Sequence, residues 1–236
     1  MKNRALVIAK TNFRSLLPVY LVAAAVMLSV LIQDGILLIL TLFGSNPNGP
    51  DNMTVSIGNY LFIIVLAGAV YIPVRNFRRL MNLGARRAGF FAGCAVNYVI
   101  MAAAASLGGV ALYLTYDTFM VSRLYMGTLD VLYWFGWMDG GAVIAFFRMF
   151  AFLLMAAAVV HTLAAMQDRW YGWVTDIVIG AVVSVFVPII PLRMALLWFL
   201  NLIIFHPNAF MQIAACLILA CAVYVLNKPI LARKAI

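Results

Sequence analysis

The sequence contains no glutamate and few charged residues of any kind. Of its 236 residues, 10% are charged and 67% are hydrophobic. A water-soluble domain of this length carries a charged surface, and a composition this apolar is typical of membrane-spanning proteins. The low proportion of charged residues therefore argues against a soluble enzyme and predicts an integral membrane protein. We expect a single transmembrane domain over residues 1–236.

Motifs for nucleotide binding and metal chemistry are missing as well. The phosphate-binding pattern G-x-x-x-x-G-K-[ST] does not occur, and the dipeptide Gly-Lys is absent from the sequence. Cys94, Cys216 and Cys221 lie in apolar stretches without metal-ligand spacing, so we interpret them as packing residues. The two histidines are not paired with acids in a metalloprotease motif. We expect no catalytic site, no metal and no cofactor, and any ATP would be bound by another polypeptide.

Six apolar stretches are long enough to cross a membrane. A helix needs about 20 such residues to cross a hydrocarbon core about 30 Å thick. A seventh run, Met194–Phe205, lies between prolines and is too short to span, so we interpret it as a short re-entrant outer helix between spans 5 and 6. The prediction is an all-α fold with six transmembrane helices: Leu17–Leu42, Val55–Val74, Ala88–Tyr113, Ala142–Ala165, Trp173–Ile190 and Ala209–Leu226.

The basic residues indicate how these helices are oriented. With the N-terminus in the cytoplasm, 13 of the 16 Lys and Arg residues fall in cytoplasmic segments, as the positive-inside rule requires. We therefore predict a multi-pass protein of the cell membrane with both termini cytoplasmic. Contact with anionic membrane lipid explains the net charge of +9 without a nucleic-acid partner. The cytoplasmic basic residues would be Lys2, Arg4, Lys10, Arg14, Arg75, Arg78, Arg79, Arg86, Arg87, Arg169, Lys228, Arg233 and Lys234.

The N-terminal residues 2–16 predict an amphipathic helix. Lys10 and Arg14 fall on one side, and apolar side chains such as Ile8 and Phe13 fall on another. Such a helix is expected to lie in the cytoplasmic interface of the membrane before the first span begins. A generic basic anchor is the alternative interpretation.

The most informative segment is residues 75–87, RNFRRLMNLGARR. Phe77, Leu80, Met81 and Gly84 recur at the spacing i, i+3, i+4, i+7, which predicts a short helix with one apolar ridge between arginines. This ridge could insert into a groove on a cytosolic partner or lie on lipid headgroups. A positive-inside loop that happens to be helical is the alternative.

The order of these parts resembles the membrane subunit of a type-2 ATP-binding-cassette exporter. Those permeases have an N-terminal interfacial helix, six spans, a coupling helix between spans 2 and 3 and a re-entrant outer element between spans 5 and 6. The best match in letters is Arg75–Gly93, RNFRRLMNLGARRAGFFAG, where such permeases often show a basic run, LGxxR and then aromatic residues. Two features depart from that layout, namely a shorter element between spans 5 and 6 and a longer outer loop, Asp117–Gly141.

The resemblance implies a function and its partners. The chain would be a permease that exports a hydrophobic or amphipathic substrate such as a lipid, a peptide or an antimicrobial. Its partners would be a separate cytosolic ATPase subunit and a second permease subunit, identical or different. Within the coupling helix, Phe77, Leu80 and Met81 would contact the ATPase while Arg78 and Arg86 orient the docking. The alternative is a six-span substrate-capture subunit of a vitamin importer, which also lacks an ATPase but needs no coupling helix.

Two charged residues are predicted at similar depth inside the outer leaflet. Asp34 lies in the first span and Arg148 in the fourth. Charged side chains inside a bilayer are costly unless they are paired. We expect Asp34 and Arg148 to pair as a structural clamp between the two spans, with contact to substrate as the alternative.

Overall fold

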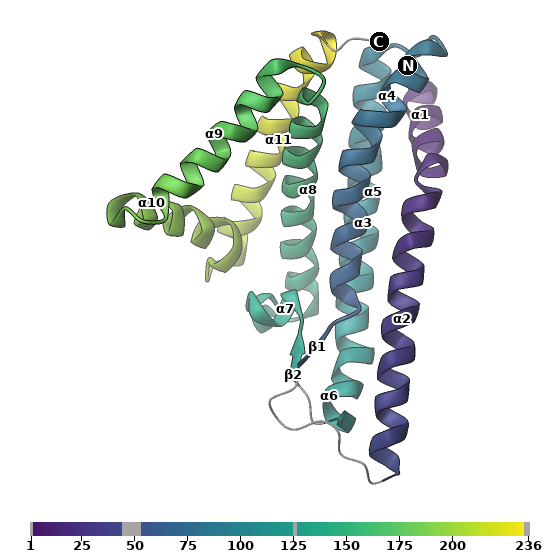
Figure 1. Ribbon diagram of the computed structural model, residues 1–236, viewed down its shortest axis with the longest axis vertical. Helices are drawn as coiled ribbons and strands as arrows, with labels where there is room; N and C mark the ends of the chain where they lie inside the picture. The colour runs from purple at the N-terminus through teal and green to yellow at the C-terminus, as the bar shows by residue number, and fades with distance from the viewer. Residues whose placement is uncertain (1, 44–52, 125–126, 234–236) are drawn as a thin grey trace.

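The computed structural model describes residues 2–43, 53–124 and 127–233, and it is almost entirely helical (Figure 1). Five helical segments among these residues are long and apolar enough to cross a membrane. They are Leu17–Leu42, Gly58–Asn82, Arg87–Arg123, Ala142–Met166 and Ala209–Leu231. The prediction of an all-α fold with several helices suited to cross a membrane is therefore confirmed, and these helices suggest a multi-pass membrane protein.

Several of these segments contain more than one helical element. Short π-helical turns (η1, η2 and η4) and one 3-10 turn (η3) join or extend the α-helices. In chain order the helical elements are α1 Lys2–Ser15, α2 Leu17–Leu42, α3 Gly58–Tyr71, η1 Ile72–Asn76, α4 Phe77–Asn82, α5 Arg87–Leu112, η2 Tyr113–Asp117, α6 Thr118–Leu124, α7 Val131–Trp134, η3 Trp137–Gly140, α8 Ala142–Met166, α9 Trp170–Phe186, α10 Ile190–Leu200, η4 Asn201–Phe205 and α11 Ala209–Arg233.

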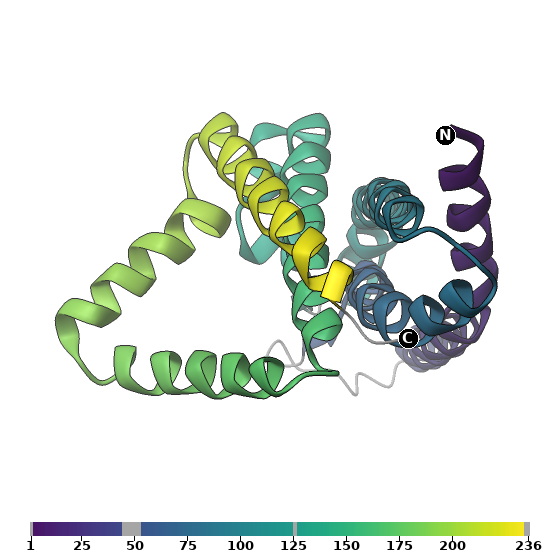
Figure 2. The same cartoon turned by 90° about the horizontal axis from the view of Figure 1, so that it is seen from above.

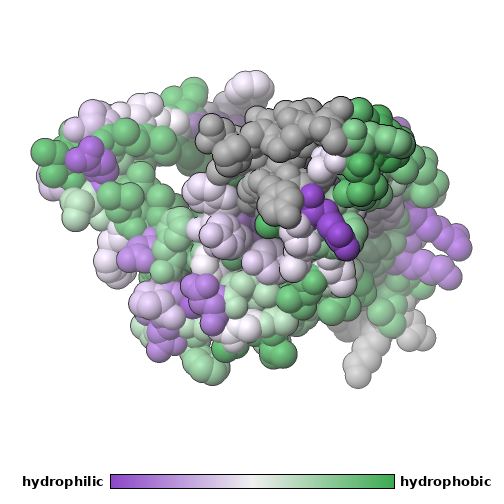
Figure 3. Space-filling model, turned by 90° about the horizontal axis from the view of Figure 1, so that it is seen from below, coloured by the Kyte–Doolittle hydropathy of each residue, from purple (hydrophilic) through white to green (hydrophobic). Residues whose placement is uncertain are grey.

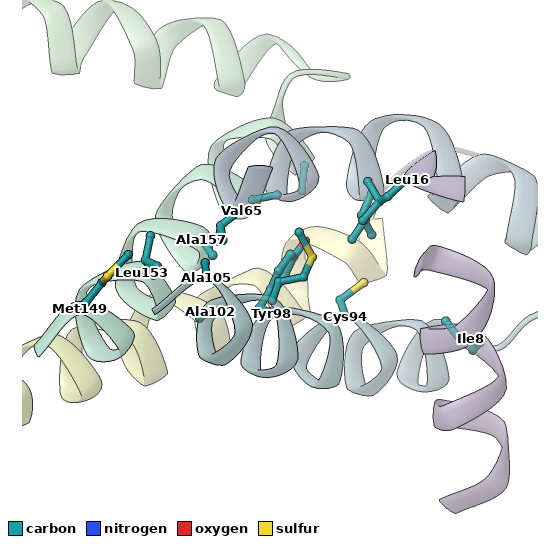
Figure 4. Close-up of a cluster of buried hydrophobic side chains, with 14 of the residues drawn as sticks. Ile8, Leu16, Val65, Cys94, Tyr98, Ala102, Ala105, Met149, Leu153 and Ala157 are labelled. Carbon is teal, nitrogen blue, oxygen red and sulfur yellow. The ribbon is translucent and has the colours of Figure 1, made fainter. Parts of the chain in front are cut away.

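Helices α3, α5 and α8 pack against one another and form the centre of the molecule, with α2 beside α3 and α11 beside α8. The core between them is built from Val65, Tyr98, Ala102, Met149 and similar buried side chains (Figure 4). Small residues allow the helices to approach closely. At Gly109, for example, an added Cβ would come within 2.7 Å of the terminal methyl group of Met149, so this flexible side chain would have to shift.

The fifth predicted span is different in the structure. Helix α9 ends at Phe186, and α10 together with η4 turns away from α9 by 114°. Pro188 and Pro191 lie at the bend, where proline interrupts helical hydrogen bonding. The run Met194–Phe205 is helical, as predicted, but Trp173–Ile190 is not a straight span. The predicted count of six spans is reached only if the bent pair is counted as one.

The bent pair reaches away from the rest of the molecule, as Figures 1 and 2 both show. None of the residues of α10 is buried, and in α9 only Gly172 is. We call α9, α10 and η4 together the arm. Most apolar side chains of α9 and α10 are therefore exposed to whatever surrounds the chain, whereas Ile203 of η4 is buried.

A small sheet was not predicted. Strand β1, Met53–Val55, pairs in parallel with β2, Gly127–Leu129, and joins the connection before α3 to the loop after α6. Each strand has three residues, too few for an alternating pattern to be recognised in the sequence. Seen from below, this end of the molecule carries hydrophilic residues among hydrophobic ones (Figure 3), as expected for a surface that meets water.

Candidate partner-binding surface at the basic end

One end of the helical bundle collects most of the basic side chains. Helices α1 and α4, the first turn of α5 and the last turns of α11 all lie at this end (Figure 1), which we call the basic end. Segments far apart in the sequence thus form one surface. The basic residues with described side chains there are Lys10, Arg14, Arg75, Arg78, Arg79, Arg86, Arg87, Arg169 and Lys228.

The orientation of α4 corrects the predicted contact with a partner. The apolar ridge points into the chain itself: Phe77 is 0% exposed, Leu80 7% and Met81 8%. The ring of Phe77 meets Phe90 edge to face, with centroids 5.3 Å apart. Burying an apolar side chain of this size is worth about 1.5–3 kcal/mol, so a helix this short turns its single apolar side to its own bundle. Phe77 and Met81 are therefore part of the core of this chain, and Leu80, although it is mostly buried, also lines a groove at the surface.

The opposite side of α4 is the accessible one. Arg75, Arg79, Asn82 and Arg86 are exposed there, and Leu83 at the end of the helix is 74% exposed. The predicted contact Arg78 is also on the surface, where it donates to Asp168 Oδ1 at 3.1 Å in the turn between α8 and α9. An exposed ion pair of this kind contributes little stability, so Arg78 remains available to exchange partners.

Glycine determines how α4 ends. Gly84 has φ = 79°, the left-handed conformation that favours glycine. Its N–H donates to Met81 O at 2.9 Å, and the N–H of Ala85 donates to Leu80 O at 3.0 Å. These two bonds form the Schellman pattern that closes a helix C-terminus. The glycine of the LGxxR motif is therefore required by the turn that presents Leu83 and Arg86.

A groove of about 450 Å³ lies between α1, α4 and the start of α5. Val7 and Thr11 line it from α1, and Leu83, Gly84 and Arg86 line it from the other side. Val7 is 63% exposed and Leu83 74%. The groove thus combines apolar walls with a cationic edge, which suits an amphipathic segment that carries acidic residues.

Buried asparagines attach α1 to the rest of the basic end. Asn12 Nδ2 donates to Asn97 Oδ1 at 3.2 Å, and Asn76 Nδ2 donates to Asn12 Oδ1 at 3.1 Å. Asn76 also donates to Ser15, and Asn97 Nδ2 donates to Ala9 O at 3.2 Å. Asn12 and Asn97 are 0% exposed and Asn76 is 3% exposed. Because these amides bond one another across α1, η1 and α5, the three elements share one buried polar cluster, which we call the asparagine cluster.

The asparagine cluster was not predicted from the sequence. The available signal was Asn12 itself, which stands between Ala9, Phe13 and Leu16 on the apolar side of the predicted N-terminal helix. A polar residue on an apolar helix face indicates either that it has a buried hydrogen-bond partner or that the buried face of the helix was assigned wrongly. The helix does form, but its position in the membrane interface stays a prediction.

Comparison with known families, curated proteins and solved structures finds no match. Among the residues with described positions, no group of three or more His, Cys, Asp or Glu could hold a metal ion. The basic end remains the part of the chain whose shape and charge are best suited to binding.

Asp34 and Arg148 were predicted to pair with each other, but the structure gives each of them other partners. Asp34, 2% exposed, accepts a hydrogen bond from Tyr116 Oη at 2.7 Å, which joins α2 to η2. Arg148, 7% exposed, donates to the carbonyl oxygens of His206 at 2.9 Å and Pro207 at 3.1 Å. The first span lies beside α3 rather than α8, so the two residues belong to different parts of the bundle.

Arg148 instead fixes the end of the arm. The two carbonyl groups that it contacts belong to His206 and Pro207, which directly follow the end of η4 at Phe205. Trp137 Nε1 and Gln212 Nε2 donate to the neighbouring carbonyls of Ile204 at 2.8 Å and Ile203 at 3.0 Å. Together these donors hold η4 against α8 and α11. Arg148 was expected to hold the first and fourth spans together. In the structure it joins α8 to the segment that follows η4 instead.

Proposed function

We propose that this chain is the permease subunit of an ATP-driven exporter, with a separate cytosolic ATPase subunit docked on the basic end. The observation that carries the proposal is α4: a short helix at the end of a membrane span whose apolar side is buried and whose arginines and Leu83 face outward. No sequence motif for ATP binding is present, so the partner would supply the hydrolysis.

The docking surface differs from the one that the resemblance implied. Leu83 and Val7 would be the apolar contacts in the groove between α1 and α4, which Arg86 also lines. The exposed Arg75 and Arg79 do not line the groove and would steer an acidic segment of the ATPase toward it. Charged residues at the rim of an interface mainly steer association, while a few apolar anchors carry most of the affinity.

Movement of the partner would reach the membrane through two connections. Gly58–Asn82 forms one helical segment from α3 through η1 to α4, so a push on α4 acts directly on that span. The asparagine cluster links η1 to α1 and α5. A displacement of α4 would therefore tilt a block of helices, as in other shear-type transitions.

A second permease subunit would complete the export pathway. Only 6% of the most apolar stretch of α2 is buried within the chain, and α10 has no buried residue. Two facing subunits could enclose a pathway between such surfaces that one bundle cannot. The apolar character of these surfaces favours a hydrophobic or amphipathic substrate.

The test is a docking variant that leaves the core intact. Arg79→Glu combined with Leu83→Ala should release the ATPase from the purified complex, or uncouple its hydrolysis, while the permease still inserts into the membrane. The matched control is Arg123→Glu, an exposed arginine of α6 at the other end of the molecule. Unchanged partner retention and unchanged ATPase activity in the double variant would overturn the proposal. Binding of one vitamin by the isolated chain would then favour the capture-subunit alternative.

A further inference from the structure

Two hollows lie along the seam between α5 and α11. The first, about 330 Å³, is at the basic end and is lined by Arg87, Ala88, Phe91, Lys228 and Leu231. Of these lining residues two are basic and none is acidic. The first hollow is therefore a cationic site on the same end of the bundle as α4.

The second hollow, about 310 Å³, continues from the first toward the middle of the helices. Phe91 and Tyr98 line it from α5, Leu154 from α8, and Leu217 and Tyr224 from α11. Phe91 also lines the first hollow, so the two adjoin along one seam. The walls of the second hollow are almost entirely apolar.

The seam is open because α11 packs mainly against α8. Two hydrogen bonds join α11 to α5 across the seam: Tyr224 Oη donates to Phe91 O at 2.6 Å, and Arg87 Nη1 donates to Leu231 O at 3.0 Å. The rings of Phe91 and Tyr224 stack with centroids 4.5 Å apart. These bridges hold the helices at a fixed separation and position Arg87 at the edge of the first hollow.

The length of the seam is the length of a lipid chain. Lys228 and Leu217 are eleven residues apart on α11, which corresponds to about 16 Å at 1.5 Å per residue. Half of a hydrocarbon core about 30 Å thick has nearly the same depth. A ligand that reaches from the cationic hollow to the end of the apolar one would thus match a single membrane leaflet.

We propose that the seam binds one anionic phospholipid, with its phosphate between Arg87 and Lys228 and one acyl chain along Phe91, Tyr98 and Leu217. Charge complementarity selects the headgroup, since cationic side chains at a membrane surface attract anionic lipid. The apolar second hollow selects hydrocarbon, because a polar group placed there would lose its hydration. This site does not involve α4 or an ATPase, so it stands or fails independently of the proposed function.

Lipid retention by the purified full-length chain tests the headgroup site. Native mass spectrometry in detergent, with added dioleoyl phosphatidylglycerol or phosphatidylcholine, should show one phosphatidylglycerol retained in preference to phosphatidylcholine. Lys228→Glu should lower that retention by about tenfold or more, because it reverses one of two charges. The matched control is Lys10→Glu, an exposed lysine of α1 at the same end, which should have no effect.

Two neighbouring variants test the part of the site that would hold the acyl chain. Leu217 lines the second hollow, whereas the next residue, Ile218, is 68% exposed and does not line it. Leu217→Trp should fill the hollow and reduce phosphatidylglycerol retention severalfold, and Ile218→Trp should leave retention unchanged.

Cys221 provides a readout in the unmodified protein. It lines the second hollow and is exposed, while Cys94 and Cys216 are buried. Phosphatidylglycerol should slow its alkylation by a membrane-soluble maleimide, and phosphatidylcholine should not. Equal retention of both lipids, an equal loss with Lys10→Glu and Lys228→Glu, or competition by glycerol phosphate as strong as by the complete lipid would each overturn the proposal.

Discussion

Helices α4 and α10 are both short, apolar on at least one side and joined to longer helices, yet their surroundings are opposite. In α4 the side chains of Phe77, Leu80 and Met81 are buried. In α10 no residue is buried, and Trp198 is 68% exposed. The difference shows that an apolar ridge in a sequence does not identify a binding face, since the ridge of α4 belongs to the core and its arginine side is the one left accessible.

The largest expected effect is the loss of the α4 core contact. Phe77→Ala should lower the free energy of unfolding by about 3–5 kcal/mol, because it removes a fully buried ring and leaves a cavity beside Phe90. Thermal unfolding in detergent measures the change. Trp198→Ala in α10 should cost less than about 1 kcal/mol. Similar losses for both variants would remove the contrast between the two helices.

The next effect concerns the anchor of the arm. Arg148→Gln should destabilise the chain by about 2–4 kcal/mol, because the buried Arg148 side chain holds the segment that follows η4 through two hydrogen bonds to its carbonyl groups. Asp34→Asn should act separately through Tyr116, so the double variant should be additive within about 0.5 kcal/mol. A double variant that is clearly less destabilised than the sum would restore the pair expected from the sequence.

The asparagine cluster is expected to have an intermediate effect. Asn12→Leu and Asn76→Leu should each cost about 1–3 kcal/mol, because each leaves buried amide groups without a partner. The two losses should be non-additive by at least about 0.5 kcal/mol, since the residues bond directly. Ser29→Ala on the exposed side of α2 is the control, with an expected change close to zero. Strictly additive losses would mean that α1 and η1 are not joined through these amides.

The smallest effect on stability is expected on the other side of α4. Leu83→Ala and Arg79→Glu should each change the free energy of unfolding by less than about 0.5 kcal/mol, because both side chains are exposed. The same unfolding measurement, made beside Phe77→Ala, compares the two sides of one helix. A large loss with Leu83→Ala would mean that this residue is part of the fold and not of a docking surface.

Much of the architecture followed from patterns in single segments. The lengths of the apolar stretches predicted the helices, and the bounds of α2, Leu17–Leu42, agree with the structure. The short helix before Gly84 and the helix at the N-terminus were also predicted. The bend between α9 and α10 had a signal in Pro188 and Pro191, but the prediction placed the end of the span beyond Pro188.

The sequence by itself determined which segments form helices and which residues share a helix face, because these depend on neighbours within a few turns. Only the tertiary structure decided what each face contacts. The burial of Phe77, the separate partners of Asp34 and Arg148, and the meeting of Asn12, Asn76 and Asn97 all join elements that are distant in the chain. Periodicity carries no information about such contacts, because a buried face and a partner-binding face follow the same helical repeat.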